Sequence, residues 1–570
     1  MLDRLNRLTN WQVAIAFAVV GFFILITGIN NPFMFDDIKQ IVTNVPVHSI
    51  KNIVSFFEGG TFYFGRGLAP LGGVYYRPLM STAFSLLYTL FGPHPFAFHA
   101  FQFVLYLTSA FILYLFLKHF IKPVVALFLA LLFLVHPLNS QVVFALPNMQ
   151  DVLFFFFGIL SLWLLVRFKS TKALLPTVLC LFLALLSKES GVVFVLIALV
   201  YLYLFYRKRL MSFSGMVVLP IVLWIVLKIH AVGLNGNPSN APIDFLSFGE
   251  RLLTMPSILL FYIEKFLLPL KLSSAYYWTY STFSFAHVVI PLLIDLAVIG
   301  LFVYLGVQIH RNGTKKQFKS YLFFTIWTAI GLGIILQIIP LDMTACEAWF
   351  YFPMAGLLGM IGVSISVLPF NLRIDRRIFY IVAIAIIILL GIRMSLRGTD
   401  WSNPNTIAEK DVSTSNSDDY AAYDQLATVY FSEHEFSESV QSIKMSVAIF
   451  PNSQNYYILG YVLAYQGDYG SAYNAYIKGL TYQPYQPIYD QLAILSTHYG
   501  SPIQYEKLLQ NRLLVTPSDY TLWFYLAVLQ YRQIDISDAQ NSITQALKYA
   551  PPNPTISAVY KSIMNETPLP

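Results

Sequence analysis

Long apolar stretches follow one another along the first part of the chain, and short polar or basic segments separate them. A membrane-spanning helix needs about 20 predominantly apolar residues, and stretches close to that length recur here. We therefore expect a polytopic, all-α membrane domain over residues 1–398, with a long first outer loop at 30–80. The pattern predicts eleven spans, near residues 11–29, 96–117, 121–136, 143–166, 173–187, 190–206, 212–231, 288–309, 320–340, 348–369 and 378–395.

Two further apolar stretches, 81–92 and 252–270, would break the alternation of the loops if they crossed the membrane. The second stretch carries Glu264 and Lys265 within it. We interpret both stretches as interfacial or re-entrant helices on the outer side. A true span at 252–270 is the alternative, and it would place the basic loop at 310–319 outside.

Basic residues indicate the orientation of the spans, because Lys and Arg are enriched in cytoplasmic loops. Six basic clusters occupy alternate connections, and all of them fall on the cytoplasmic side only if the N-terminus is cytoplasmic. Everything after the last span is then outside. The clusters are Arg4 and Arg7, Lys118 and Lys122, Arg167, Lys169 and Lys172, Arg207, Lys208 and Arg209, Arg311, Lys315, Lys316 and Lys319, and Arg373, Arg376 and Arg377.

The pattern changes near residue 398 to a polar, tyrosine-rich sequence without a spanning segment. A pattern of about four tetratricopeptide repeats is predicted over 420–570, after a linker at 399–419, with a generic helical bundle as the alternative. Such repeats stack into an α-solenoid with a concave face. The evidence is a leucine followed by a small residue at steps of 33, 33 and 34 residues, at Leu426-Ala427, Leu459-Gly460, Leu492-Ala493 and Leu526-Ala527, and prolines at the same steps, Pro451, Pro484, Pro517 and Pro551.

Hydrophobic residues make up 57% of the 570 residues and charged residues 11%, whereas soluble domains carry about 25% charged residues. This composition excludes a soluble globular enzyme and a disordered chain. The two cysteines, Cys180 and Cys346, lie inside apolar stretches and form no disulfide framework. The sequence has no Lys/Arg stripe interleaved with aromatic residues, so we expect no nucleic-acid partner.

The pair Asp36-Asp37, directly after the first span, is the first candidate for chemistry. Carboxylates at a membrane surface lose solvation, so their presence there needs a reason. Either aspartate can cap a helix formed by the following IKQIV segment. The alternative is a general base that takes a proton from an incoming hydroxyl while a partner orients that hydroxyl.

Arg77 lies in the motif Tyr75-Tyr76-Arg77-Pro78-Leu79, where the first outer loop ends. A guanidinium is permanently charged and binds phosphate through two parallel hydrogen bonds. The proline that follows suits the first turn of a helix. Binding of a phosphate and contact with lipid headgroups are both open at this position.

Further ionisable residues lie at the predicted outer ends of the spans. Each alone is compatible with a structural role, such as mutual neutralisation of Lys188 and Glu189. Their shared side favours a functional site, because ionisable groups at membrane depth are rare and usually functional or paired. No HExxH or CxxC spacing occurs, so the sequence indicates no metal site. The residues of this group are His94, His99, His136, Asp151, Lys188, Glu189 and Glu347.

These motifs, in this order, resemble the transmembrane and tetratricopeptide-repeat-containing O-mannosyltransferases, which are glycosyltransferases of the GT-C fold. More distantly, the layout is similar to protein O-mannosyltransferases and lipid A aminoarabinose transferases. The similarity covers nearly the whole chain. It rests on the Asp-Asp pair, the YRPL motif, His136-Pro137 followed by Asp151, the Lys188-Glu189-Ser190-Gly191 span start, and the late Glu347.

The resemblance implies a polyprenyl-phosphate sugar donor and an acceptor on the outer face. By motif, Asp36 or Asp37 is the general base, and Asp36 is favoured as the first acid of the pair. Arg77 and Lys188 then bind the donor phosphate. The residues that line or brace the site are His99, His136, Asp151, Glu189 and Glu347.

The expected function is transfer of a single sugar, mannose by the resemblance, to a protein hydroxyl, with inversion and without a cofactor or metal. The chain departs from the family pattern at Asn139-Ser140-Gln141, Met149-Gln150 and Ala348, which bears on the sugar more than on the reaction type. The repeats would bind the polypeptide or another subunit. We expect a plasma membrane location, first a bacterial inner membrane, with the endoplasmic reticulum as the alternative. Alternative functions are an oligosaccharide ligase, a glycan- or lipid-modifying GT-C transferase, and a non-catalytic repeat scaffold.

Overall fold

The computed structural model of the protein describes residues 8–63, 71–72, 75–233, 241–367, 376–414, 419–483, 485–495, 502–550 and 553–569. The chain divides into two compact units, and unit 1 runs to Thr414 while unit 2 begins at Ser415. This division falls inside the segment 399–419 that was predicted to be a linker. The basic residues Arg4, Arg7 and Arg373 lie outside the described residues.

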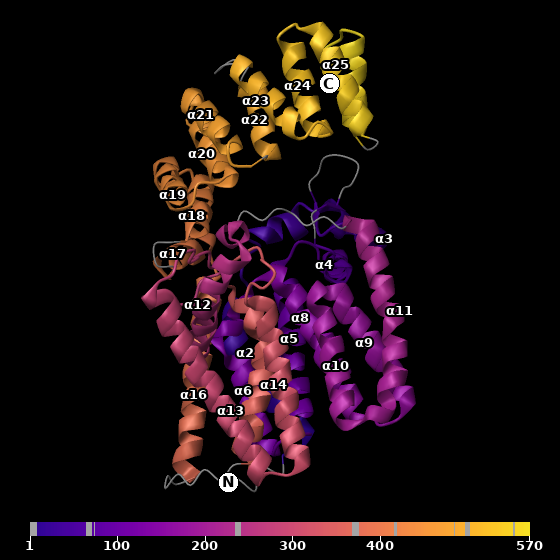
Figure 1. Ribbon diagram of the computed structural model, residues 1–570, viewed down its shortest axis with the longest axis vertical. Coiled ribbons are helices and arrows are strands. Elements are labelled where there is room, and N and C mark those ends of the chain that lie inside the picture. Colours follow the sequence, from indigo (N-terminus) through magenta and orange to yellow (C-terminus); the bar gives the residue numbers. More distant parts are fainter. Residues whose placement is uncertain are drawn as a thin grey trace. The chain divides into compact units, whose positions relative to one another are not determined.

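Unit 1 is a bundle of apolar helices (Figure 1). Among the described residues, eight apolar segments are long enough to cross a membrane, and a bent pair of helices makes a ninth. Two of the predicted spans are shorter apolar helices, α9 (Leu174–Ser187) and α10 (Val192–Phe205). The eight segments are built on α2 (Asn10–Leu25), α5 (Pro95–Leu117), α8 (Met149–Arg167), α11 (Arg207–Val232), α13 (Ile290–Asn312), α14 (Lys315–Ile335), α15 (Tyr351–Val367) and α16 (Arg376–Asp400), and the bent pair is α6 (Pro123–Val135) with α7 (Ser140–Phe144).

These helices coincide with the eleven predicted spans, so the all-α polytopic fold is confirmed. Three of them, α11, α13 and α16, bury only 11%, 17% and 22% of the residues in their apolar segments. Apolar surface on that scale cannot face water without a large free-energy cost, so it indicates contact with lipid. The helix α12 (Phe248–Leu267) carries four charged residues and does not meet the same test of length and apolarity.

The basic loops of unit 1 lie together at one end of the bundle. Lys118 after α5 donates a hydrogen bond to the side chain of Asn10 at the start of α2. Arg209 at the start of α11 donates to the backbone oxygen of Phe168 at 3.1 Å, and Lys319 on α14 donates to that of Leu204 at 2.7 Å. Figure 1 shows the α10–α11 and α13–α14 turns at the end marked N, opposite α3 and α4. The basic clusters of these connections therefore share one end.

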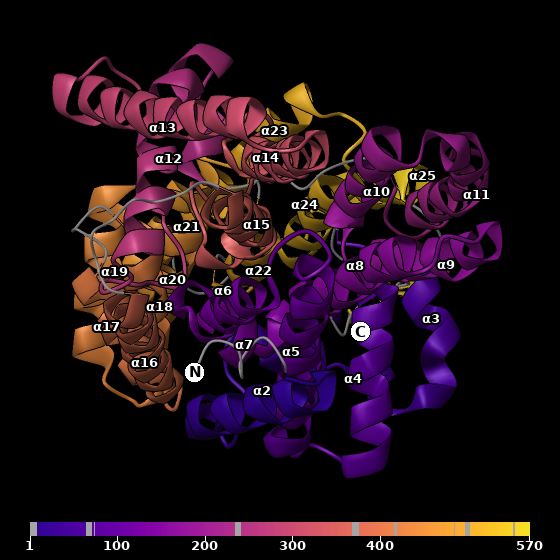
Figure 2. The same ribbon diagram turned by 90° about the horizontal axis from the view of Figure 1, so that it is seen from below.

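The first outer loop is a folded cap at the opposite end. It contains a π-helix (Ile38–Val42), 3-10 turns at Val45–His48 and Ile50–Asn52, α3 (Ile53–Glu58), and β1 (Phe62–Tyr63) paired antiparallel with β2 (Leu71–Gly72). Its apolar side chains pack with α4 (Pro78–Phe91), and Phe56, Met80 and Phe84 are all buried. Figure 2, which looks at the bundle from below, shows α4 from the side. This helix therefore lies across the bundle and not parallel to it.

Unit 2 consists of repeated helix pairs. The leucine and small-residue pairs found in the sequence fall on the first helix of each pair. The turns between paired helices repeat too, because His434, Gly467 and Ile534 all adopt positive φ. The helices are α18 (Tyr420–Ser432), α19 (Phe436–Ile449), α20 (Ser453–Tyr465), α21 (Tyr469–Leu480), α22 (Gln486–Leu495), α23 (Pro502–Val515), α24 (Tyr520–Arg532), α25 (Ile536–Tyr549) and α26 (Pro554–Met564), and α17 (Pro404–Thr414) precedes them in unit 1.

The glycine of the second repeat, Gly460, has a packing reason. A Cβ atom added to Gly460 on α20 would lie 2.5 Å from Cε1 of Tyr476 on α21. Only a residue without a side chain lets the two helices approach so closely that the buried tyrosine ring lies against the backbone. The repeat pattern in the sequence therefore records the contact between paired helices.

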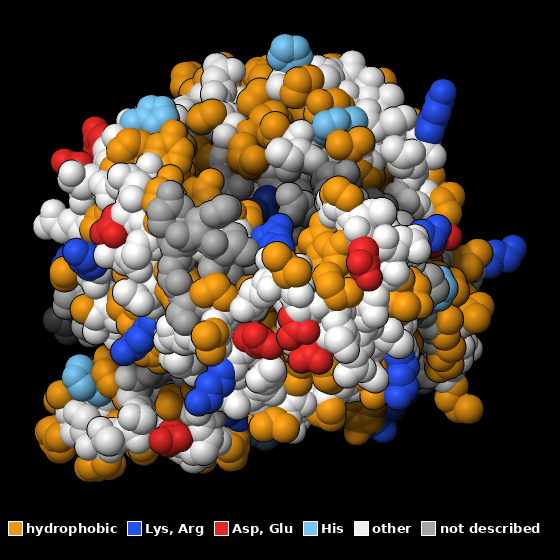
Figure 3. All heavy atoms as spheres, turned by 90° about the horizontal axis from the view of Figure 1, so that it is seen from above, with side chains coloured by type: hydrophobic (Ala, Val, Ile, Leu, Met, Phe, Trp, Pro, Cys, Tyr) orange, Lys and Arg blue, Asp and Glu red, His pale blue; other side chains and the backbone are white. Residues whose placement is uncertain are grey.

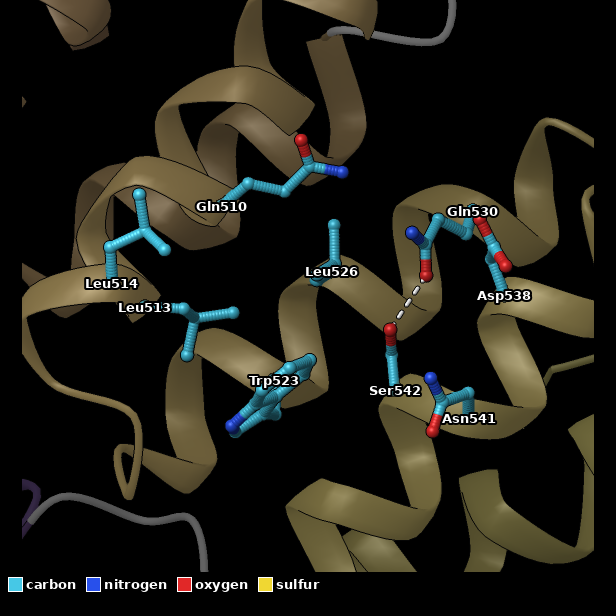
Figure 4. Close-up of a pocket in the computed structure, with 9 residues that line it drawn as sticks. All are labelled: Gln510, Leu513, Leu514, Trp523, Leu526, Gln530, Asp538, Asn541 and Ser542. Carbon is cyan, nitrogen blue, oxygen red and sulfur yellow. Dashed lines mark hydrogen bonds between the residues drawn. The ribbon is translucent and has the colours of Figure 1, made fainter.

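A pocket of about 360 Å³ lies within unit 2, between α23, α24 and α25 (Figure 4). Leucines and the ring of Trp523 form one side, and amide, hydroxyl and carboxylate groups form the other. The face of the molecule drawn in Figure 3 carries acidic and basic side chains scattered among apolar ones. The lining residues of the pocket are Gln510, Leu513, Leu514, Trp523, Leu526, Gln530, Asp538, Asn541 and Ser542.

Candidate active site

Arg77 lies at the entry to α4, in contact with a residue more than a hundred positions later in the chain. Its Nε atom is 3.7 Å from Oε2 of Glu189, and its side chain is only 10% exposed. The backbone N–H of Tyr76 donates to Oε1 of the same carboxylate at 3.1 Å. Glu189 opens the turn before α10, so two of the predicted site residues, Arg77 and Glu189, lie together.

The ring of Tyr75 supports the guanidinium of Arg77. The Cζ atom of Arg77 lies 4.0 Å from the ring centroid, which is a cation–π contact. The phenol of Tyr75 donates a hydrogen bond of 2.6 Å to Oδ2 of Asp342, in the loop between α14 and α15. Burial, above all, raises the pKa of Tyr75 well above its usual range, and the Asp342 charge adds to this. Tyr75 therefore stays a neutral hydrogen-bond donor.

Asp37 is the buried member of the acidic pair. Its side chain is 3% exposed, and Oδ2 accepts a hydrogen bond of 3.0 Å from the backbone N–H of Met34. Its other oxygen has no partner among the described residues. Burial raises the pKa of Asp37 to about 8, and the neighbouring Asp36 contributes to the rise. Asp37 is therefore mostly protonated at neutral pH.

Asp36 is the accessible member of the pair. Its side chain is exposed to solvent, although protein crowds it enough that desolvation raises its pKa. The charges of Lys39 and Arg77 oppose that rise, and the charge of Asp342 reinforces it. These charges act on Asp36 because the acidic pair, the YRPL motif and the 341–346 loop lie close together. Asp36 is thus a carboxylate of this site that an incoming group can reach, whereas the exposed Asp342 already accepts a hydrogen bond from Tyr75.

Lys188 and Asp151 form a second ion pair beside this group. Their Nζ and Oδ1 atoms are 2.7 Å apart, and their side chains are 15% and 6% exposed. Lys188 adjoins Glu189 in the chain, so the pair is next to the contact that Glu189 makes with Arg77. The ammonium of Lys188 is largely shielded from solvent and held by Asp151, so it is a positioned charge at this end of the bundle.

Glu347 belongs to a separate, buried cluster. One of its oxygens accepts hydrogen bonds from the backbone N–H of Ser273 at 2.7 Å and from the phenol of Tyr276 at 2.8 Å. The other oxygen is 4.0 Å from a guanidinium nitrogen of Arg397, which also pairs with Asp400 at 3.3 Å. No contact among the described residues joins Glu347 directly to Asp36 or Arg77. Its partners place it as a brace of the loop that carries Asp342.

His99 and His136, the two histidines predicted to line or brace the site, are buried among other side chains. The ring of His136 stacks on Phe266, donates to the backbone oxygen of that residue at 3.0 Å, and accepts from the N–H of Leu138 at 3.2 Å. His136 therefore fixes the bend between α6 and α7. His99 is 1% exposed and lies 6.0 Å from the ring of Phe103. Neither histidine contacts Asp36 or Arg77 within the described part of the chain.

Sequence reasoning missed three residues of these clusters, namely Asp342, Arg397 and Asp400. Asp342 lies in the same outer loop as Glu347, which was the available signal, but nothing in its surroundings distinguishes it from any loop aspartate. Among the described residues, no group of three or more histidine, cysteine or acidic side chains is placed to hold a metal ion.

The arrangement combines a fixed guanidinium with an accessible carboxylate at one end of an apolar bundle. Arg77 can pair with an anionic group such as a phosphate, because within the described part of the chain its guanidinium has a 3.7 Å contact to Glu189 and the ring face of Tyr75 as its direct partners. Asp36 can accept a proton from a hydroxyl that enters beside that anion.

Comparison with known proteins finds similarity to protein mannosyltransferases. Residues 77–230 match a family model described as dolichyl-phosphate-mannose-protein mannosyltransferase. A protein O-mannosyl-transferase of Caenorhabditis elegans is 24% identical over 221 residues, which is 38% of this chain and 31% of that protein. The aligned segment thus spans about a third of the curated relative. The resemblance to GT-C O-mannosyltransferases inferred from the motifs is confirmed.

Proposed function

We propose that this protein is a membrane glycosyltransferase that moves one mannose from a polyprenyl phosphate to a serine or threonine hydroxyl of a polypeptide. One observation carries the proposal: the accessible carboxylate of Asp36 lies close enough to Arg77 for the positive charge of Arg77 to lower the pKa of Asp36. The matched family model begins at Arg77 and includes Asp151, Lys188 and Glu189, which supports a role for this end of the bundle.

Arg77 binds the phosphate of the donor in this proposal. A sugar phosphodiester leaves as a polyprenyl phosphate, and the negative charge that develops on the leaving oxygen needs a fixed cation. The guanidinium provides two parallel donors for phosphate oxygens, and its Nε atom faces Glu189. Lys188 adds a second positive charge beside it, held by Asp151 at 2.7 Å. With these two cations, the reaction needs neither a metal ion nor a cofactor.

Asp36 acts as the general base. The acceptor oxygen attacks the anomeric carbon from the side opposite the phosphate, so a new C–O bond forms as the C–O bond to phosphate breaks, and the configuration inverts. The hydroxyl proton passes to the Asp36 carboxylate, and the electron pair of the broken bond leaves with the polyprenyl phosphate. Asp37 is buried and mostly protonated at neutral pH, so it shapes the turn that presents Asp36.

The helix pairs of unit 2 are about four tetratricopeptide repeats that recruit the acceptor polypeptide. Support comes from the pocket between α23, α24 and α25, whose one side is apolar and whose other side offers Gln530, Asn541 and Asp538. An extended polypeptide has both apolar side chains and backbone amides, and such a pocket satisfies both. The alternative role of the repeats is to bind another subunit.

The protein lies in a plasma membrane as a multi-pass protein, with the N-terminus cytoplasmic and the repeats outside. A bacterial inner membrane is the first choice, and the endoplasmic reticulum membrane with lumenal repeats is the alternative. The clustering of Lys118, Arg209 and Lys319 at one end of the bundle supports this orientation, since basic loops stay in the cytoplasm.

Substitution of the two aspartates tests the proposed base. Purified protein in detergent is given polyprenyl-phosphate mannose and a peptide rich in serine and threonine, and the mass of the product peptide is measured. Asp36→Asn should lower kcat by about 100-fold or more, as loss of a general base does. The matched control, Asp37→Asn, should keep most of the activity because its carboxyl is already neutral.

The same experiment separates the rival functions. Full activity of Asp36→Asn would show that Asp36 is not the general base. A gain of several sugars in one step would identify a ligase that transfers a block, and no transfer from any lipid-linked sugar would favour a non-catalytic scaffold.

A further inference from the structure

The phenol of Tyr75 donates a hydrogen bond to the carboxylate of Asp342, and this is the only hydrogen bond of the phenol among the described residues. The two oxygens are 2.6 Å apart, although 267 positions separate the residues in the chain. A short O–H···O bond to an ionised acceptor is one of the stronger hydrogen bonds in proteins. This bond therefore ties the loop between α14 and α15 to the entry of α4.

Tyr75 in turn holds one face of the Arg77 guanidinium. The Cζ atom lies 4.0 Å from the ring centroid, and the Nε atom is 3.7 Å from the Glu189 carboxylate. A guanidinium that contacts both a ring face and a carboxylate is restricted to few orientations. The orientation of Arg77 therefore depends on the position of the Tyr75 ring, and the hydrogen bond to Asp342 fixes that position.

We propose that Asp342 is a positioning residue for the transfer reaction, because it anchors Tyr75, whose ring orients the Arg77 guanidinium toward the donor phosphate. The inference rests on the proposed function and adds to it a residue from a loop far along the chain. Asp342 itself contacts neither the sugar nor the phosphate. Its influence reaches the reaction through Tyr75 and through its charge.

The charge of Asp342 has a second, separable effect, on Asp36. The groups that act on the Asp36 carboxyl are Lys39 and Arg77, which lower its pKa, and Asp342, which raises it. Asp37, from the same turn, is buried and mostly neutral at pH 7. Removal of the Asp342 charge should therefore lower the pKa of Asp36. Removal of the Tyr75 hydroxyl leaves that charge in place.

Two substitutions separate the two effects, measured as donor KM, kcat and the pH profile of kcat. Tyr75→Phe should raise the KM for polyprenyl-phosphate mannose by about tenfold, because the ring loses the hydrogen bond to a charged group that holds it against Arg77, with little change in kcat or its pH profile. In Asp342→Asn the amide oxygen can still accept from the phenol but carries no charge, so the KM should rise by a smaller factor, and the acidic limb of the kcat profile should shift to lower pH. The conservative Asp342→Glu should restore the pH profile and part of the affinity.

The matched control is Tyr88→Phe on α4, whose ring stacks on His48 and not on Arg77. This variant should leave donor KM unchanged. If Tyr75→Phe and Asp342→Asn both keep donor KM within about twofold of the parent, or if Tyr88→Phe changes it equally, Asp342 does not position Arg77.

Direct binding of the donor distinguishes failure of this inference from failure of the proposed function. In the Asp36→Asn background, which should bind polyprenyl-phosphate mannose without transferring it, Tyr75→Phe and Asp342→Asn are each added and the Kd is measured. Weaker binding in both double variants supports the positioning role even where the parent transfers no mannose. Unchanged binding overturns it, and absence of donor binding in every variant overturns it together with the proposed function.

Discussion

Asp36 and Asp37 are adjacent in the chain, yet the protein gives their carboxyl groups opposite environments. The preceding Phe35 has a φ of 52°, which is rare for a bulky residue and indicates a sharp, constrained turn. After this turn Asp37 points into the protein and Asp36 stays exposed. The sequence marks the pair as candidates, but the choice between them depends on the turn, which no local pattern reveals.

The burial of Asp37 predicts a pH-dependent stability. Its pKa is about 8 in the folded protein against an ordinary 3.8, so the folded state holds the proton more tightly than the unfolded state. Below pH 4 both states are protonated. Between pH 4 and 8 only the folded state keeps the proton, so stability falls as pH rises, and above pH 8 the cost is constant.

Asp37→Asn should therefore raise the Tm at pH 8 by about 2 °C or more and leave it nearly unchanged at pH 4. The amide oxygen can still accept the N–H of Met34, so the turn is kept. Thermal unfolding of the purified protein in detergent at the two pH values measures this difference. A lower Tm at pH 8 would mean that Asp37 is ionised in the folded protein.

The roles of Asp342 and Arg397 could not be predicted from the residues and their sequence neighbours alone. Asp342 acts through Tyr75, a partner 267 positions away, and one aspartate in a short loop has no periodicity or spacing that announces this. Arg397 lies at the end of an apolar run and looks like the end of a span, but it is 1% exposed and pairs with Asp400 and Glu347. Long-range pairing of this kind is set by the packed fold.

At the scale of elements, apolar stretches predicted the helices of unit 1 well because the signal is local and needs no knowledge of packing. The bend between α6 and α7 at Pro137 was harder to predict. Proline cannot donate a backbone hydrogen bond, and the α6–α7 pair bends there by 50°. The sequence shows the proline, whereas the direction of the bend depends on His136, whose ring binds the backbone of Phe266.

The close contact of paired helices in unit 2 predicts a steric effect of one methyl group. In Gly460→Ala the new Cβ would lie 2.5 Å from the Tyr476 ring, so α20 and α21 must move apart at a cost of about 1–3 kcal/mol. The matched control is Gly470→Ala in α21, where a Cβ meets nothing within 4 Å and should stabilise the helix by about 0.5–1 kcal/mol. Hydrogen exchange in the full chain should speed up across α20–α21 only in Gly460→Ala, and equal exchange in the two variants would refute the contact.

For the whole molecule, charge and apolar surface together give a definite expectation of sidedness. The basic connections of unit 1 share one end, and Asp36, Arg77 and Asp342 lie at the other. A lipid-linked donor keeps its tail in the bilayer, so a site at the end of the bundle can receive it at the membrane surface. From the positive-inside tendency we expect this site on the side opposite the cytoplasm, and we expect the repeats on the same side because they follow the last span.

Accessibility labelling tests that sidedness directly, because the two native cysteines, Cys180 and Cys346, are both buried and should stay unlabelled. A cysteine at the exposed Ser537 in α25 should react with a membrane-impermeant maleimide in intact cells or spheroplasts. A cysteine at the exposed Asn312, at the basic end of α13, should react only after the membrane is permeabilised. The reversed pattern would place the repeats in the cytoplasm, where an acceptor bound to them could not reach a donor at the outer leaflet. Equal labelling of the two positions before permeabilisation would show a leaky preparation, and labelling of the unsubstituted protein would show that a native cysteine is accessible.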